Sequence, residues 1–117
     1  MTTLSPGSIL LGTTRPAELR DWYRKALAPE QQGEGPIDLG GFLLVIDRRD
    51  DVDAKNGEPG RVILNFHVDD FDVVEAQLRA AGVDWLNPPE DRPSGRFGTF
   101  VDPDGNYLQI IQFKPNA

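Results

Sequence analysis

The chain has 117 residues, with 12 Lys and Arg against 19 Asp and Glu, a formal net charge of −7 and no cysteine. This length suits one domain with a real core. The acidic balance argues against nucleic acid as a partner, because no basic stripe is present to displace counterions from phosphate. The lack of cysteine excludes disulfides and thiolate metal sites.

The sequence also argues against export and membrane insertion. Residues 1–7 have neither the basic region nor the apolar core of a signal peptide. No apolar run approaches the roughly 20 residues needed to span a bilayer. We therefore expect a cytoplasmic protein with no membrane partner.

The first half predicts a strand, a helix and one or two further strands. Residues 8–13 form an apolar run typical of a strand, and Pro16 suits the first position of a helix that ends before Pro29. Residues 42–46 are apolar at every position, so this strand should be covered on both faces. A short strand at 37–39 precedes it. The apolar stripe of the helix, spaced i, i+3, i+4, i+7 and i+8, is Leu19, Trp22, Tyr23, Ala26 and Leu27.

Residues 48–60 are charged and rich in turn formers, which predicts an exposed loop between two halves. Asp51 and Asp53 have the spacing of cation ligands, but Lys55 at the next ligand position favours a solvated acidic loop.

The second half begins with a strand at 61–68 that alternates between two faces. One face carries Val62, Leu64, Phe66 and Val68, and the other carries Ile63, Asn65 and His67. Asp70 then caps a helix that ends at Gly82. The apolar stripe of that helix is Phe71, Val74, Leu78 and Ala81. A strand at 83–86 and a Pro-rich loop at 87–95 follow.

The last part of the chain predicts a β-hairpin over residues 98–111. Pro103 presets φ for the turn, Asp102 can accept hydrogen bonds within it, and Gly105 can adopt a positive φ. The spacing of Asp102, Asp104 and Asn106 also begins like a calcium loop. The Gly and Glu that such a loop needs further on are absent, which favours a plain turn.

Each half opens with a strand followed by a helix. Two copies of one small unit bury their core by pairing, since neither copy covers its sheet alone. The sequence therefore predicts a two-module α+β domain, with one helix per module on the outer face of a curved sheet.

Three segments of the second half resemble the second module of the vicinal oxygen chelate superfamily. They are Phe66-His67-Val68-Asp69-Asp70, Leu78-Arg79-Ala80-Ala81-Gly82-Val83 and Phe100-Val101-Asp102-Pro103-Asp104-Gly105-Asn106-Tyr107-Leu108-Gln109. The superfamily includes glyoxalase I, extradiol dioxygenases, fosfomycin-resistance enzymes and bleomycin-binding proteins. Residues 8–47 match more weakly, through Trp22-Tyr23.

The resemblance implies one glyoxalase-like domain over residues 1–117, with module 1 at about 8–48, a linking loop at about 49–60 and module 2 at about 61–114. The modules would be βαβββ units that form a cup-shaped mixed sheet with helices outside, the first module being shortened. The cup would often be completed across a homodimer.

The resemblance also shows which positions hold metal ligands in related enzymes. The last ligand matches Gln109, the ligand that opens the second module falls on Ile63, and its counterpart in the first module falls on or near Ser8. The carboxylate position of the first module lies within residues 42–46, which contain none. Because a catalytic metal needs about three strong ligands, typically His or carboxylate, we expect no metal and no cofactor.

The remaining candidates are ligand-binding residues in the cup: Ile63, Asn65, His67, Trp85, Tyr107 and Gln109. His67 could accept a proton or anchor a ligand, or be a half-exposed histidine at a strand end. Gln109 and Asn65 would bind either a ligand or a neighbouring side chain, because a buried amide without a partner is costly. Trp85 and Phe97 could stack on a ligand or belong to the core.

These residues lead to three hypotheses. The first is metal-independent binding of a small organic molecule in the cup, such as sequestration of a drug or toxin, and the acidic balance would suit a cationic one. The second is a lyase, isomerase or dioxygenase-type enzyme with a degenerate metal site, which uses His67 and Gln109. The third is a module that has lost its ligand and persists through dimerisation.

Overall fold

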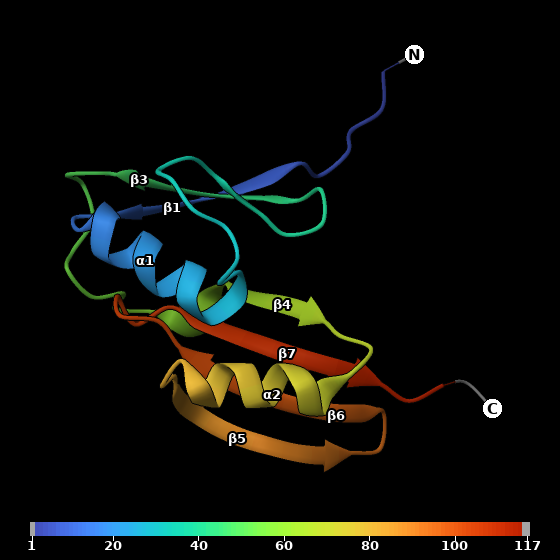
Figure 1. Ribbon diagram of the computed structural model, residues 1–117. Coiled ribbons are helices and arrows are strands. Elements are labelled where there is room, and N and C mark those ends of the chain that lie inside the picture. Colours follow the sequence, from blue (N-terminus) through green and yellow to red (C-terminus); the bar gives the residue numbers. More distant parts are fainter. Residues whose placement is uncertain (1, 116–117) are drawn as a thin grey trace. The chain divides into compact units, whose positions relative to one another are not determined.

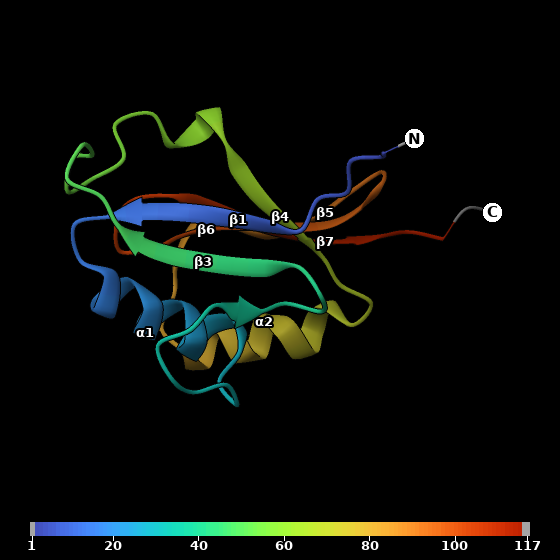
Figure 2. The ribbon, with the colours of Figure 1, turned by 90° about the horizontal axis from the view of Figure 1, so that it is seen from above.

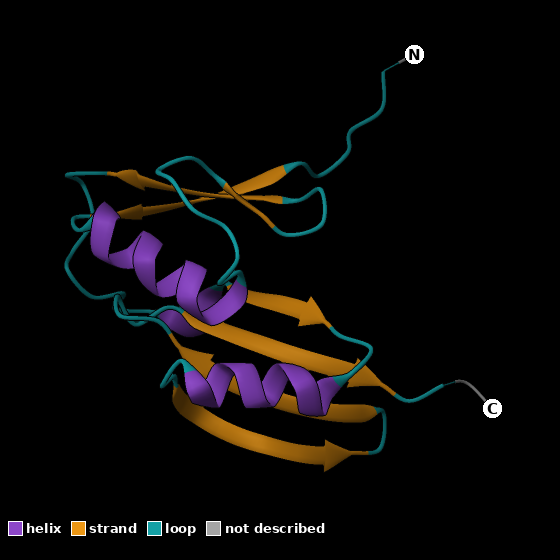
Figure 3. Ribbon diagram, in the orientation of Figure 1, coloured by secondary structure: helices purple, strands orange, loops and turns teal. Residues whose placement is uncertain are grey.

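The computed structural model describes residues 2–115, which form two compact units that divide between Ala54 and Lys55. The division falls within the segment predicted as a loop. Each unit contains its own sheet and one helix (Figure 1, Figure 3). The fold is therefore α+β, as predicted. Within residues 2–115, neither helix is long and apolar enough to cross a membrane.

The first unit contains a three-stranded sheet in the order β1-β3-β2, with β1 parallel to β3 and β2 antiparallel to it. Its elements are β1 (Ser8–Thr13), α1 (Pro16–Leu27), β2 (Ile37–Asp38) and β3 (Leu43–Arg48). The unit is thus one strand shorter than the βαβββ pattern. The predicted strand at 8–13 and helix start at Pro16 are confirmed.

Helix α1 lies on one face of this sheet (Figure 2). Leu19, Tyr23 and Ala26 from the predicted stripe are fully buried. Strand β3 supplies Leu44 and Ile46 to the same core. Leu43 and Val45, which alternate with them, remain partly exposed, so the expectation that this strand is covered on both faces holds on one face only.

The second unit contains a four-stranded sheet in the order β4-β7-β6-β5. Strands β4 and β7 are parallel, whereas β6 is antiparallel to both of its neighbours. The elements are a 3₁₀ turn at Pro59–Arg61, β4 (Ile63–His67), α2 (Phe71–Ala80), β5 (Asp84–Arg92), β6 (Gly95–Val101) and β7 (Tyr107–Phe113). This is the predicted order of strand, helix and three strands.

The predicted caps of this unit are present. Asp70 accepts a hydrogen bond from the Val73 amide at 3.3 Å and so caps α2, and Gly82 follows the helix with φ of 76°. In the hairpin, Asp102 accepts hydrogen bonds from the Asp104 amide and from the Asn106 amide and side chain. Gly105 has the expected positive φ, 85°.

Strand β5 is longer than the sequence patterns predict. A strand was expected at 83–86 and a Pro-rich loop at 87–95, but β5 continues to Arg92. Its pairing with β6 shifts register twice, between Trp85 and Asn87 and between Asn87 and Glu90. Because β5 is an edge strand, prolines cost it little, since an edge strand needs no amide hydrogens on its outer side. The expectation of a loop here was wrong.

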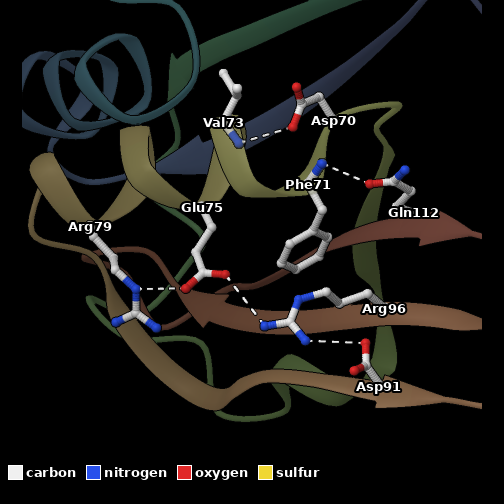
Figure 4. Close-up of polar contacts among 8 residues, drawn as sticks. All are labelled: Asp70, Phe71, Val73, Glu75, Arg79, Asp91, Arg96 and Gln112. Atoms are coloured by element: carbon white, nitrogen blue, oxygen red, sulfur yellow. Dashed lines mark hydrogen bonds and ion pairs between the residues drawn. The ribbon is translucent and has the colours of Figure 1, made fainter.

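Ion pairs and stacked side chains join α2 to the sheet (Figure 4). Glu75 on α2 binds Arg79 Nε at 2.8 Å and lies 3.7 Å from an Nη atom of Arg96 on β6, which also binds Asp91 on β5. The Arg96 guanidinium lies 5.2 Å from the centre of the Phe71 ring. These contacts cover the α2 side of the sheet.

Candidate functional site

The side chains of β7 alternate between the two faces of the sheet. Leu108 and Ile110 are buried, and Gln112, on the same side, accepts a hydrogen bond from the Phe71 amide at the start of α2. Tyr107, Gln109 and Ile111 therefore point to the other side. We name this side, opposite α2, the open face of the second unit.

A row of polar side chains crosses the open face from one edge to the other. The strand registers pair Asn65 on β4 with Gln109 on β7, Gln109 with Thr99 on β6, and Thr99 with Asn87 on β5. Directly paired residues project on the same face of a sheet. Three carboxamides and one hydroxyl therefore lie side by side, and we name them the polar row.

One hydrogen bond organises the middle of this row. Gln109 Nε2 donates to Thr99 Oγ1 at 3.1 Å, and Thr99 is only 4 % exposed. Asn65 lies on the edge strand and is exposed. Within residues 2–115 its amide makes no hydrogen bond to the protein. Asn65 is thus free to bind a molecule that lies over β4 and β7.

An aromatic cluster borders the polar row on one side. His67 pairs with Ile111, which in turn pairs with Phe97. The His67 and Phe113 rings meet edge to face at 5.0 Å between centroids, and Phe97 and Phe113 do so at 6.0 Å. His67 and Phe113 are exposed. The cluster offers ring surface beside the amides, as a site for an aromatic molecule would.

Apolar and aromatic side chains border the polar row on its other side. Ile63 pairs with Tyr107, and Tyr107 pairs with Val101. Tyr107 and Val101 are partly exposed, and Ile63 is 39 % exposed. The open face thus has a polar centre between two rows that are mainly apolar.

The candidate residues from the sequence divide between the two faces. Ile63, Asn65, His67, Tyr107 and Gln109 lie together on the open face. Trp85 lies on the α2 side instead, because it pairs with Phe100, meets the Phe100 ring at 5.7 Å and lies 5.3 Å from the Arg79 guanidinium. Stacking of a ligand on Trp85 is therefore not part of the site.

Sequence patterns missed Thr99, Asn87 and Phe113 as neighbours of the site. The turn at residues 102–106 fixes the register of β6 and β7, so the pairing of Thr99 with Gln109 could have been predicted from the position of the turn. The pairing of Asn87 was not, because it depends on the register shifts in β5.

The positions that hold a metal in related enzymes do not fit one in this unit. Ile63 has no donor atom, and the nitrogen of the neutral Gln109 amide is bound to Thr99. Within residues 2–115, no group of three or more His, Asp or Glu side chains is close enough to hold a metal ion. The residues present do not supply the His and carboxylate donors of a catalytic metal site.

A model of the glyoxalase-like domain family matches residues 8–111. The chain therefore belongs to this family, and the resemblance to the vicinal oxygen chelate superfamily is confirmed. A comparison with curated proteins gave no match.

Solved structures share the fold along nearly the whole chain. TnmS3, an antibiotic binding protein from Streptomyces sp. CB03234, is 22% identical, with a TM-score of 0.71 over 97% of this chain and 99% of that one. TioX from Micromonospora sp. ML1 is 21% identical, with a TM-score of 0.72 over 94% of this chain and 99% of its own. A glyoxalase/bleomycin resistance protein/dioxygenase from Nocardioides is 15% identical, with a TM-score of 0.74 over 100% and 88%. Identities this low show the fold alone.

Proposed function

We propose that the protein binds a small organic molecule on the open face of the second unit without the help of a metal. Asn65 and Gln109 are the polar anchors, Tyr107 and Ile63 provide packing surface, and His67 borders the ligand together with Phe113. The observation that carries the proposal is the polar row between two mainly apolar rows. Binding sites for small molecules typically combine an apolar lining with a few placed polar groups.

Sequestration of a drug or toxin is the form of binding that we favour. One support is that Ile63 and Gln109, at the positions that hold a metal in related enzymes, do not suit metal-assisted chemistry. The other is the fold shared with an antibiotic binding protein. We further propose that the protein acts as a homodimer in the cytoplasm. Light scattering during size-exclusion chromatography would measure the dimer, and a monomer at all concentrations would contradict that part.

The test is a titration of ¹⁵N-labelled protein with a panel of two- and three-ring aromatic compounds, both uncharged and cationic. Binding at the open face should shift the side-chain amide signals of Asn65 and Gln109. Substitution of Asn65 by Ala should weaken binding by about three- to ten-fold, the effect of one lost hydrogen bond. Val73→Ala is the matched control, because Val73 is 62% exposed on α2, away from this face.

Two outcomes would contradict the proposal. Compounds that shift only signals of α2 would place binding elsewhere. A panel without any binder would favour the hypothesis of a module that has lost its ligand.

A second candidate function is an enzyme, favoured by the exposure of His67 beside the polar row. An imidazole there could exchange a proton with a bound molecule. If the protein converts a compound from the panel, His67→Ala should abolish turnover. If it only binds the compound, His67→Ala should change the affinity modestly, and chromatography should recover the compound unchanged.

A further inference from the structure

The hydrogen bond between Gln109 and Thr99 uses the nitrogen end of the Gln109 amide. The bond runs from Nε2 to the hydroxyl of Thr99, a residue that is 4 % exposed. The nitrogen and oxygen of a planar amide point in different directions, so Oε1 is directed away from Thr99. Within residues 2–115, Oε1 accepts no hydrogen bond. Gln109 therefore offers an acceptor on the open face.

The surroundings of Oε1 carry little formal charge. On β4, β7 and β6, the titratable side chains of the open face are His67 and Tyr107. The nearest carboxylates in register lie on β5, at Asp84 and Glu90, and Glu90 is already bonded to Arg92. A cationic ligand over β4 and β7 would lose water without gaining an ion pair, which is costly. An uncharged molecule avoids that cost.

We propose that Thr99 is a positioning residue that holds Gln109 Oε1 toward the ligand, so that the open face selects uncharged aromatic molecules that carry an O–H or N–H donor. This inference rests on the proposed function and adds the class of ligand. It also assigns to Thr99, through its hydrogen bond to Gln109, control over which ligand binds.

The test compares two probes that differ in one hydrogen-bond donor, 2-naphthol and 2-methoxynaphthalene. Both have two fused rings, and both oxygens can accept, but only the naphthol can donate. Dissociation constants from amide shifts of the labelled wild-type protein should favour 2-naphthol by about five-fold, the effect of one net hydrogen bond. A wild-type protein that binds both probes equally, or prefers the methoxy compound, would overturn the inference.

Substitutions of Thr99 separate positioning from structure. Thr99→Val keeps the shape of the side chain and removes the hydroxyl, so the preference for 2-naphthol should disappear while the backbone spectrum stays native. Thr99→Ser keeps the hydroxyl and should keep the preference. An unchanged preference in a natively folded Thr99→Val protein would overturn the inference.

A carboxylate at position 109 provides a further control. Glu presents acceptor oxygens at both ends and needs no positioning, so Gln109→Glu should keep the preference for the donor. Adding Thr99→Val to Gln109→Glu should then have no effect on that preference. Loss of the preference in the double variant alone would contradict the role assigned to Thr99.

One measurement requires no ligand and separates the inference from the proposed function. The two side-chain N–H signals of Gln109 should move and exchange faster with solvent in Thr99→Val than in the wild type, because one of them loses its partner. Unchanged signals would overturn the positioning role. Probes that shift no open-face signal, together with the expected change in Gln109, would count against the proposed function instead.

Discussion

The indole ring of Trp85 occupies the space that a side chain at position 98 would need. A β-carbon added to Gly98 would lie 2.9 Å from Trp85 Cζ3 and 3.3 Å from Pro89 Cγ. Gly98 lies on the α2 side of β6, between Arg96 and Phe100 in the alternation of that strand. The absence of a side chain there leaves room for the Trp85 ring, which lies on the same side of the sheet as Gly98.

We expect Gly98→Ala to destabilise the protein by about 1–3 kcal/mol, because an added methyl group in a packed site forces its neighbours out of position. Urea unfolding followed by Trp fluorescence would measure the change. Gly60→Ala is the matched control, since nothing lies within 4 Å of its added β-carbon, and it should change stability by less than about 0.5 kcal/mol. Equal effects of the two substitutions would contradict the packing role of Gly98.

The Asp102 carboxylate organises the turn between β6 and β7. It accepts hydrogen bonds from the Asp104 amide at 2.8 Å, from the Asn106 amide at 2.9 Å and from Asn106 Nδ2 at 2.8 Å, and Asp102 is only 4 % exposed. Asp102→Ala would remove the acceptor of one buried and two partly buried N–H donors. We expect a loss of about 2–4 kcal/mol in the free energy of unfolding.

Chemical denaturation would measure this loss, with Asp53→Ala in the exposed loop as the control. A loss below about 1 kcal/mol for Asp102→Ala would show that water replaces the carboxylate at little cost.

Addition of metal should not stabilise the protein, because Ile63 and Gln109 cannot act as strong ligands. The measurement is thermal unfolding of chelator-treated protein with and without Zn, Ni, Mn, Fe(II) or Co. A metal that binds only the native state at 100 times its dissociation constant would add about 2.7 kcal/mol, a shift of several degrees. Stoichiometric metal together with such a shift would contradict the expectation and favour the enzyme hypothesis.

The hydrogen bond from the Arg49 guanidinium holds the pKa of Asp51 below its ordinary value. The stabilising effect of a lowered carboxyl pKa is present above the unfolded-state pKa and is lost as the pH falls through the folded-state pKa. Because the pair is exposed, the pKa itself is a better observable than stability. Arg49→Met should raise the pKa of Asp51 in a carboxyl ¹³C titration, whereas Arg48→Met should leave it unchanged.

The parts of the fold set by local chemistry were predictable from the sequence. The Asp70 cap, the turn around Asp102 and the buried stripe of α1 each depend on residues close together in the chain. The course of β5 was not predictable, because its prolines are typical of a loop and become compatible with a strand only at a sheet edge.

The candidate site was likewise predictable only where it depends on local sequence patterns. Strand alternation predicted that Ile63, Asn65 and His67 share a face, and the structure confirms this arrangement. Trp85 could not be assigned to a face, because the register shifts that follow it break the alternation along β5. The turn makes the pairing of Thr99 with Gln109 predictable, but the role of Thr99 depends on the hydrogen bond between their side chains, which no local pattern contains.

Side chains on β4, β6 and β7 alternate between the two faces of the sheet, so substitutions on the two faces have different consequences. Residues that face α2, such as Phe100 and Leu108, are fully buried, so their substitution would threaten the fold itself. The residues between them project from the face opposite α2, and each member of the polar row comes from a different strand. Single substitutions on this face can therefore change its surface chemistry while the scaffold stays intact. If this face binds a ligand as we propose, a change of ligand would therefore require no change of the core.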